Sequence, residues 1–207
     1  GLGSIYWHMV SKLLLAVYEI TEKAIENNED TTLIGRLFDH YFEINAGIGA
    51  HKSPELYGAF PTDPYSHTPG GKGAQQPGMT GQVKEDILCR FGELGVRVQN
   101  GVLGFDPTIL RSEEFLQEPQ VFHYVDVANK ASTIQLEKDT LAFTHCQVLI
   151  VYKKSLDPSI EVVFTTGDSK LIPGNLLTNE LSIAVFQRKN IISKIIVSIV
   201  KKNDLVT

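Results

Sequence analysis

The sequence has 207 residues, of which 43% are hydrophobic and 21% are charged, and its 24 acidic and 19 basic residues give a net charge of −5. This composition excludes a disordered tail and a disulfide-stapled miniprotein, because it supplies enough apolar side chain to bury a substantial core. No stripe of Lys and Arg is interleaved with aromatic residues, so we expect no nucleic-acid partner.

No membrane segment or secretion signal is predicted. The longest apolar run, near 13–17, is far shorter than the roughly 20 residues that cross a bilayer. The N-terminus lacks the basic patch and the small-residue cleavage site of a signal peptide. We therefore expect the chain as given to be soluble, without a membrane partner, and we favour the cytoplasm as its compartment.

Three helices are predicted in the first half of the chain. Apolar residues recur at three- and four-residue steps over residues 4–27, on a stripe so wide that this helix must be buried on most sides. A second helix begins with a cap from Asp30 or Thr31 and ends near Gly47. A third, capped by the Thr80 hydroxyl, runs to Gly95.

Between the second and third helices, residues 46–78 hold seven of the 17 glycines and five of the nine prolines. A stretch of this length without regular structure is uncommon in compact domains and is usually functional or disordered. It keeps Tyr57, Phe60, Tyr65 and His67, which a flexible linker would not need. We interpret it as an ordered, functional loop.

The second half of the chain is predicted to be β-structure. The dipeptide Asn100-Gly101 tolerates the positive φ angles of a tight turn and predicts an antiparallel hairpin. The predicted fold class is α+β, with a helical segment over 1–94 and an antiparallel β-sandwich over 95–207. The predicted strands are Val96–Gln99, Val102–Phe105, Val121–Val127, Thr133–Leu136, Leu141–Tyr152, Glu161–Thr165, Leu181–Phe186 and Lys194–Val200.

Neither a metal nor another cofactor is expected. The six histidines show no H-x-x-x-H spacing and there is no C-x-x-C pair, while His145 and Cys146 are neighbours on a predicted strand and point to opposite faces. A Ser66-His67-Asp63 triad is disfavoured, because Gly-x-Ser-x-Gly is absent. Both cysteines, Cys89 and Cys146, are expected to be reduced and buried.

A pocket wall is predicted from three segments: Trp7-His8, the aromatic loop 61–69 and the residues 75–82. At a helix entry, residues 78–82 offer free amides, a hydroxyl and a side-chain amide to an anion or a sugar. The alternative is that these residues only form a turn and a cap, with His8 as a satisfied core histidine. The residues themselves leave both interpretations open.

Four segments resemble, in order, the end of the inverting glycoside phosphorylases of the cellobiose and chitobiose phosphorylase type. They are residues 3–16 (GSIYWHMVSKLLLA), the Pro/Tyr-rich loop, residues 77–82 (PGMTGQ) and residues 94–107 (LGVRVQNGVLGFDP). In that family these features close an (α/α)6 barrel of the six-hairpin type and pass into a C-terminal β-sandwich. The resemblance implies that the chain is the C-terminal part of a larger sugar-acting enzyme, whose catalytic acid lies in an upstream barrel.

The resemblance also implies roles for individual residues. His8 matches the phosphate-contacting histidine, and Thr80-Gly81-Gln82 match the phosphate loop, although Gln82 replaces a second hydroxyl residue. Phosphate and water therefore both stay open as the acceptor, and so does the competing interpretation of a non-catalytic carbohydrate-binding or structural β-sandwich module. The expected partners are an oligosaccharide or disaccharide and inorganic phosphate. The residues expected to bind sugar are Trp7, Asp63, Tyr65, His67, Gln75 and Gln76.

Overall fold

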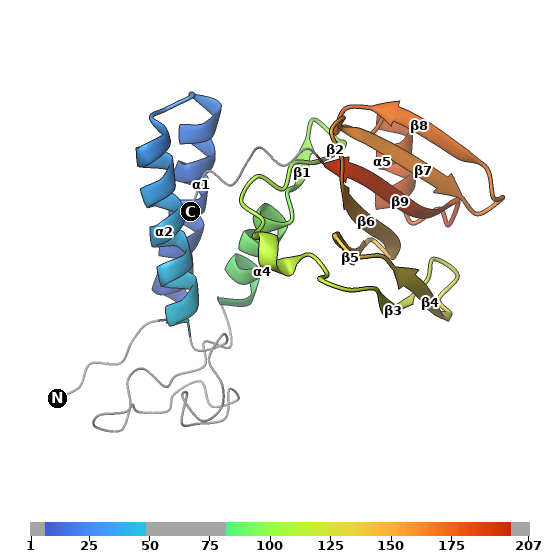
Figure 1. Cartoon of the computed structure of the whole chain (residues 1–207), viewed down its shortest axis with the longest axis horizontal. Coiled ribbons are helices and arrows are strands. Elements are labelled where there is room, and N and C mark those ends of the chain that lie inside the picture. Colours follow the sequence, from blue (N-terminus) through green and yellow to red (C-terminus); the bar gives the residue numbers. More distant parts are fainter. Residues whose placement is uncertain (1–6, 49–81, 200–207) are drawn as a thin grey trace, which may run out of the picture. The chain divides into compact units, whose positions relative to one another are not determined.

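The computed structural model describes residues 7–48 and 82–199. The protein is of the α+β class, as predicted, and divides into two compact units, one ending at Gly92 and one starting at Glu93 (Figure 1). The first unit is helical and the second contains the strands. Each unit is described by itself below.

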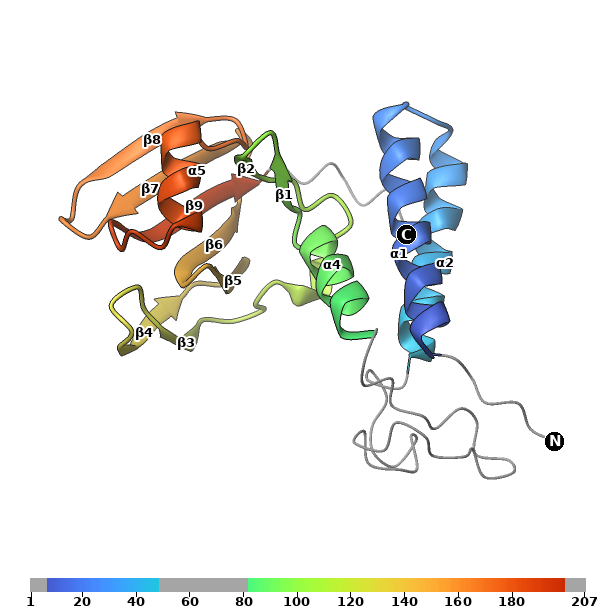
Figure 2. The same cartoon turned by 180° about the vertical axis from the view of Figure 1, so that it is seen from behind.

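The helical unit contains α1 (Trp7–Glu26), α2 (Thr31–Gly47) and α4 (Gln82–Glu93), which extends one residue beyond it. The Asp30 side chain caps α2, as the sequence predicts, by accepting hydrogen bonds from the amides of Thr32 and Leu33. Helices α1 and α2 pack side by side around buried apolar residues (Figures 1 and 2). These buried residues include Leu14, Ala24, Ile34, Phe38 and Tyr41.

The second unit opens with the predicted hairpin, formed by β1 (Val96–Gln99) and β2 (Val102–Phe105). Asn100 and Gly101 both have positive φ angles, 51° and 79°, as the tight turn requires. A short 3-10 helix, η2 (Ser112–Glu114), and a second hairpin of β3 (Gln120–Val125) and β4 (Ala131–Leu136) follow.

A five-stranded sheet forms the centre of the second unit, in the order β5-β6-β9-β7-β8. Strands β6 and β9 pair in parallel, so the expectation of antiparallel pairing throughout is wrong for this pair. The reason is that β9 returns along β6 after the intervening β7–β8 hairpin and a helix. The strands are β5 (Thr140–His145), β6 (Val148–Lys154), β7 (Ser159–Phe164), β8 (Ser169–Pro173) and β9 (Ile192–Ile199).

Both faces of β6 are covered. Ile150 and Tyr152 belong to the main core, which includes the β1–β2 hairpin and α5 (Asn179–Phe186), whereas Leu149 and Val151 pack with the β3–β4 hairpin. Burial on both sides explains why the strand is a continuous apolar run and not an alternating pattern.

Two predictions about individual segments are wrong. Residues 181–186 were expected to form a strand but belong to helix α5, which the Thr178 hydroxyl caps by accepting a hydrogen bond from the Leu181 amide. The expected strand 141–152 is two strands, because Cys146 and Gln147 have φ angles of 50° and 69° and reverse the chain. Cys146 therefore lies in a turn, where it is only partly buried, and does not share a strand with His145.

Candidate functional site

Most of the predicted pocket residues lie outside the residues that the structure describes. Of the other three, Trp7 and His8 are the first two residues of α1, and Gln82 is the first residue of α4, which therefore starts two residues after the predicted Thr80. Their side chains are not among those described. The pocket residues outside the described ranges are Asp63, Tyr65, His67, Gln75, Gln76, Thr80 and Gly81.

The beginnings of α1 and α4 lie at the same end of the helical unit (Figures 1 and 2). The helices approach each other where Gly92 of α4 faces Tyr18 of α1, so closely that a methyl group on Gly92 would lie 2.3 Å from Tyr18 Cζ. Gln82 lies ten residues before Gly92, and His8 lies ten residues before Tyr18. Ten residues of an α-helix rise by about 15 Å. The two helices run in the same direction from this end of the unit (Figures 1 and 2).

Two polar side chains are buried one turn beyond these helix starts. Ser11 is fully buried and Glu85 is only 4% exposed. Positions 8 and 11 share one face of α1, and positions 82 and 85 share one face of α4, because residues three apart are neighbours on a helix surface. Polar groups thus follow both helix starts into the interior of the unit.

Ser11 and Glu85 are not among the site residues predicted from the sequence. Glu85 lies in the first turn of α4, where a carboxylate ordinarily complements the helix macrodipole. The missed signal was its spacing: Glu85, Cys89 and Gly92 form one stripe of α4, and all three are buried. Small residues at positions 89 and 92 indicate a closely packed face, so a carboxylate on the same stripe must also be buried.

The second unit holds a network around the segment 94–107. The Asp106 carboxylate accepts a hydrogen bond from the Thr108 hydroxyl at 2.7 Å and lies 3.9 Å from the Arg97 guanidinium. The buried Tyr152 hydroxyl donates to the Leu94 carbonyl at 2.5 Å, and burial, with a contribution from Asp106, raises the pKa of this phenol. A phenol held protonated is a permanent donor, so this network anchors the hairpin to the sheet.

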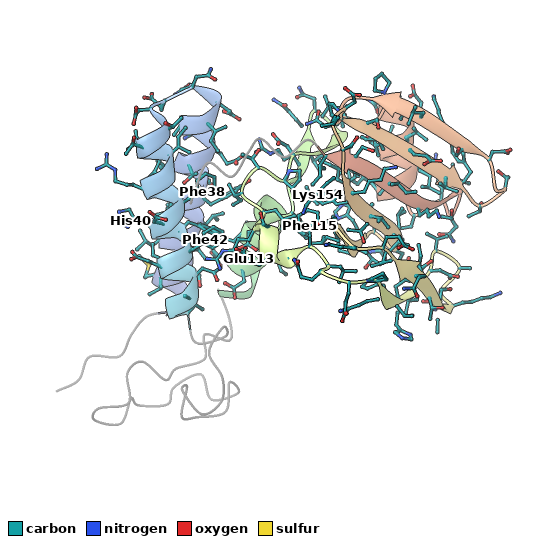
Figure 3. The ribbon with its side chains drawn as sticks, in the orientation of Figure 1. Phe38, His40, Phe42, Glu113, Phe115 and Lys154 are labelled. Atoms are coloured by element: carbon teal, nitrogen blue, oxygen red, sulfur yellow. The ribbon has the colours of Figure 1, made fainter. Side chains whose placement is uncertain are left out.

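A charged pair lies at the C-terminal end of β6. Lys154 Nζ lies 2.6 Å from the Asp139 carboxylate and 5.2 Å from the centre of the Phe115 ring (Figure 3). The lysine lowers the pKa of Asp139 by hydrogen bonding and by its charge. The contact with Phe115 joins the segment after η2 to the sheet and stabilises the fold.

Within residues 7–48 and 82–199, no three His, Cys, Asp or Glu side chains lie close enough together to hold a metal ion. Both cysteines are free thiols, and Cys89 is buried. None of the helices within these two ranges is long and apolar enough to cross a membrane.

We expect His145, at the end of β5, to make the stability of the fold depend on pH. Burial lowers the pKa of its imidazole below the ordinary value of about 6.5. Below that pH the unfolded chain binds a proton that the folded chain rejects, so the free energy of unfolding falls until the folded pKa is passed. We expect urea unfolding at pH 5 to 8 to show this loss, and His145→Gln to reduce it.

His123 supplies the control for this pH experiment, because it lies exposed on β3. The His123→Gln variant should keep the slope of stability against pH that the unmodified chain shows between pH 5 and 6.5. Equal slopes in the unmodified chain and in His145→Gln would contradict the assignment.

No protein-family model matches the chain, and no curated protein matches it in sequence. The candidate site therefore rests on the helix starts and on the buried polar groups behind them.

Proposed function

We propose that this chain is the C-terminal part of a carbohydrate-active enzyme of the six-hairpin type, either a glycoside phosphorylase or a glycoside hydrolase. In this proposal the helices are the end of an (α/α)6 barrel, and the second unit is the C-terminal β-sandwich. The chain supplies groups that bind sugar and phosphate, and the catalytic acid belongs to the preceding barrel.

The observation that carries the proposal is the common position of the two helix starts. Helices α1 and α4 begin at one end of the unit, and buried Ser11 and Glu85 follow each start. A helix start presents free amides and the positive end of a dipole, which favour a phosphate or an oxygen-rich ligand. Two such starts at one end of the unit suit the ligand that the resemblance of residues 3–16 and 77–82 implies.

The chemistry would divide between the chain and the preceding barrel. In an inverting reaction, a carboxylic acid protonates the leaving glycosidic oxygen while the acceptor attacks the opposite face of the sugar. His8, Thr80, Gly81 and Gln82 would hold the acceptor, phosphate or water. The sugar would be held by Trp7, Asp63, Tyr65, His67, Gln75 and Gln76.

Binding tests the site. In a two-dimensional NMR titration with inorganic phosphate, and separately with cellobiose, we expect the largest amide shifts at residues 7–9 and 82–84. The variants His8→Ala and Gln82→Ala should reduce these shifts. His40→Ala is the matched control, because His40 lies exposed on α2. Shifts that are absent for both ligands would contradict the proposed site, and shifts confined to the β-strands would favour the non-catalytic module.

Turnover tests the missing acid. The chain by itself should not cleave cellobiose or chitobiose, with or without phosphate, because the acid that protonates the leaving oxygen is supplied from elsewhere. Released glucose, N-acetylglucosamine or sugar 1-phosphate can be measured over a day. Cleavage that the His8→Ala variant loses would show that the chain carries its own acid, and would contradict this part of the proposal.

A further inference from the structure

One side of α1 is apolar and exposed. Met9, Leu13 and Ile20 are 56%, 53% and 52% exposed, and Ala16 lies exposed between them. The spacing of four, three and four residues places all four side chains on one stripe of the helix. The opposite side, with Ser11 and Leu14, already packs inside the helical unit, so the stripe is a second apolar surface. We call residues 9, 13, 16 and 20 the α1 stripe.

Charged residues beside the α1 stripe are arranged so that they complement a copy of themselves. Lys12 and Glu19 are exposed and lie one heptad apart along the same edge of the stripe. When two such helices pair in antiparallel orientation, with Leu13 opposite the Ala16 of the other copy, Met9 meets Ile20. The Lys12 of each helix then lies beside the Glu19 of the other. In an antiparallel pair, the edge that carries Lys12 and Glu19 faces the same edge of the other helix.

Parallel pairing gives no such match. In a parallel pair, the edge of one helix that carries Lys12 and Glu19 faces the opposite edge of the other helix. Each residue on this edge then lies beside the residue numbered five higher in the partner. Those positions are Val17 and Ala24, which carry no charge. The charges therefore select the antiparallel arrangement, which has the two-fold symmetry of a common homodimer.

From these observations we propose that α1 binds α1 of a second copy of this chain, antiparallel, through the α1 stripe. The inference goes beyond the proposed function and does not depend on it. The 20-residue helix α1 of each copy buries less area than a standard interface, which covers about 800 Å² per partner. We therefore expect a dimer that forms in the micromolar range.

A charge swap tests the proposal. Sedimentation equilibrium of the whole chain should show a concentration-dependent shift from monomer to dimer. Lys12→Glu and Glu19→Lys should each raise the dimer dissociation constant about tenfold, because each replaces two attractive pairs by two repulsive ones. The double variant carrying both changes should recover the original dissociation constant, since it restores both pairs with reversed polarity.

Two further variants complete the experiment. Leu13→Glu buries a carboxylate in the interface and should raise the dissociation constant at least about a hundredfold. Arg36→Glu changes the net charge as much as Lys12→Glu does, but it lies exposed on α2 and should leave the dimer unchanged. Circular dichroism shows whether each variant is folded; all the changed side chains are exposed.

Three results would overturn the inference. A chain that stays monomeric at several hundred micromolar leaves the α1 stripe to another occupant, such as a helix of a preceding barrel. Dimerisation that ignores Leu13→Glu uses another surface. A double variant that remains as weak as the single ones excludes the antiparallel charge pairing. None of these results bears on phosphate or sugar binding, so failure here is distinct from failure of the proposed function.

Discussion

Replacing Gly95 by alanine should lower the free energy of unfolding by about 3 kcal/mol or more, or prevent folding. Gly95 has a φ of +67°, in the left-handed region, where a side chain costs roughly 1–2 kcal/mol. An added Cβ would also lie 2.1 Å from the Asp106 carbonyl carbon and 2.2 Å from the Pro107 nitrogen. These are backbone atoms, so no side-chain rotation can relieve the overlap. The 2.7 Å hydrogen bond from the Asp106 amide to the Gly95 carbonyl would be disturbed as well.

The matched control is Gly101→Ala, in the turn of the same hairpin. Gly101 has a φ of +79° but has no atom within 4 Å of an added Cβ. It should therefore lose only the conformational part, roughly 1–2 kcal/mol. Urea unfolding followed by circular dichroism measures both variants. Equal losses in the two would show that the overlap with Asp106 and Pro107 contributes nothing.

Replacing Ser182 by alanine should cost about 1–3 kcal/mol. The Ser182 hydroxyl is fully buried, accepts a hydrogen bond from the Leu103 amide at 3.0 Å and donates to the Thr178 carbonyl at 2.8 Å. Alanine would remove the acceptor and leave the Leu103 N–H buried without this partner. The bond joins β2 to α5, so hydrogen exchange of the Leu103 amide should accelerate together with the loss of stability.

Ser193→Ala is the control for this experiment. The Ser193 hydroxyl donates to the Val163 carbonyl at 3.0 Å, but the site is only partly buried and water can replace the donor. We expect a loss below about 1 kcal/mol and no change in the exchange of Leu103. A Ser182→Ala variant as stable as Ser193→Ala would contradict the role of the buried hydroxyl.

Elements with strong local signals were predictable from the sequence. The Asp30 cap and the apolar period locate α2, and Asn100-Gly101 locates the first hairpin, because these signals act within a few residues. Helix α5 was missed because its short apolar run is equally suited to a buried strand. Burial of Leu181, Ala184 and Val185, at helical spacing, became visible only with the core around them.

Pairing between distant strands was beyond local signals. The β5–β6 turn is formed by Cys146 and Gln147, and these residue types do not predict a tight turn as Asn and Gly do. Strand β8 was missed because it lies at an exposed edge of the sheet and carries Lys170 and Pro173, which weaken the strand pattern. The parallel partner of β6 lies 45 residues further along the chain, so only tertiary packing selects it.

The sequence predicted where the two helix starts lie, but not that polar side chains behind them are buried. Residue order alone located His8 and Gln82 at the starts of two helices. The burial of Ser11 and Glu85 depends on which faces of α1 and α4 turn inward, and the Gly92–Tyr18 approach fixes that. A contact between residues more than seventy positions apart has no signature in local periodicity.

The position of β9 governs when the second unit can fold during synthesis. This strand comes last among the described strands, yet it lies in the middle of the sheet, between β6 and β7. Until it leaves the ribosome, β6 and β7 each present an unpaired edge, and neither edge can pair with the other without excluding β9. The edges of β6 and β7 therefore stay exposed in the nascent chain until β9 has been synthesised. We expect a chaperone to protect the chain most during this interval.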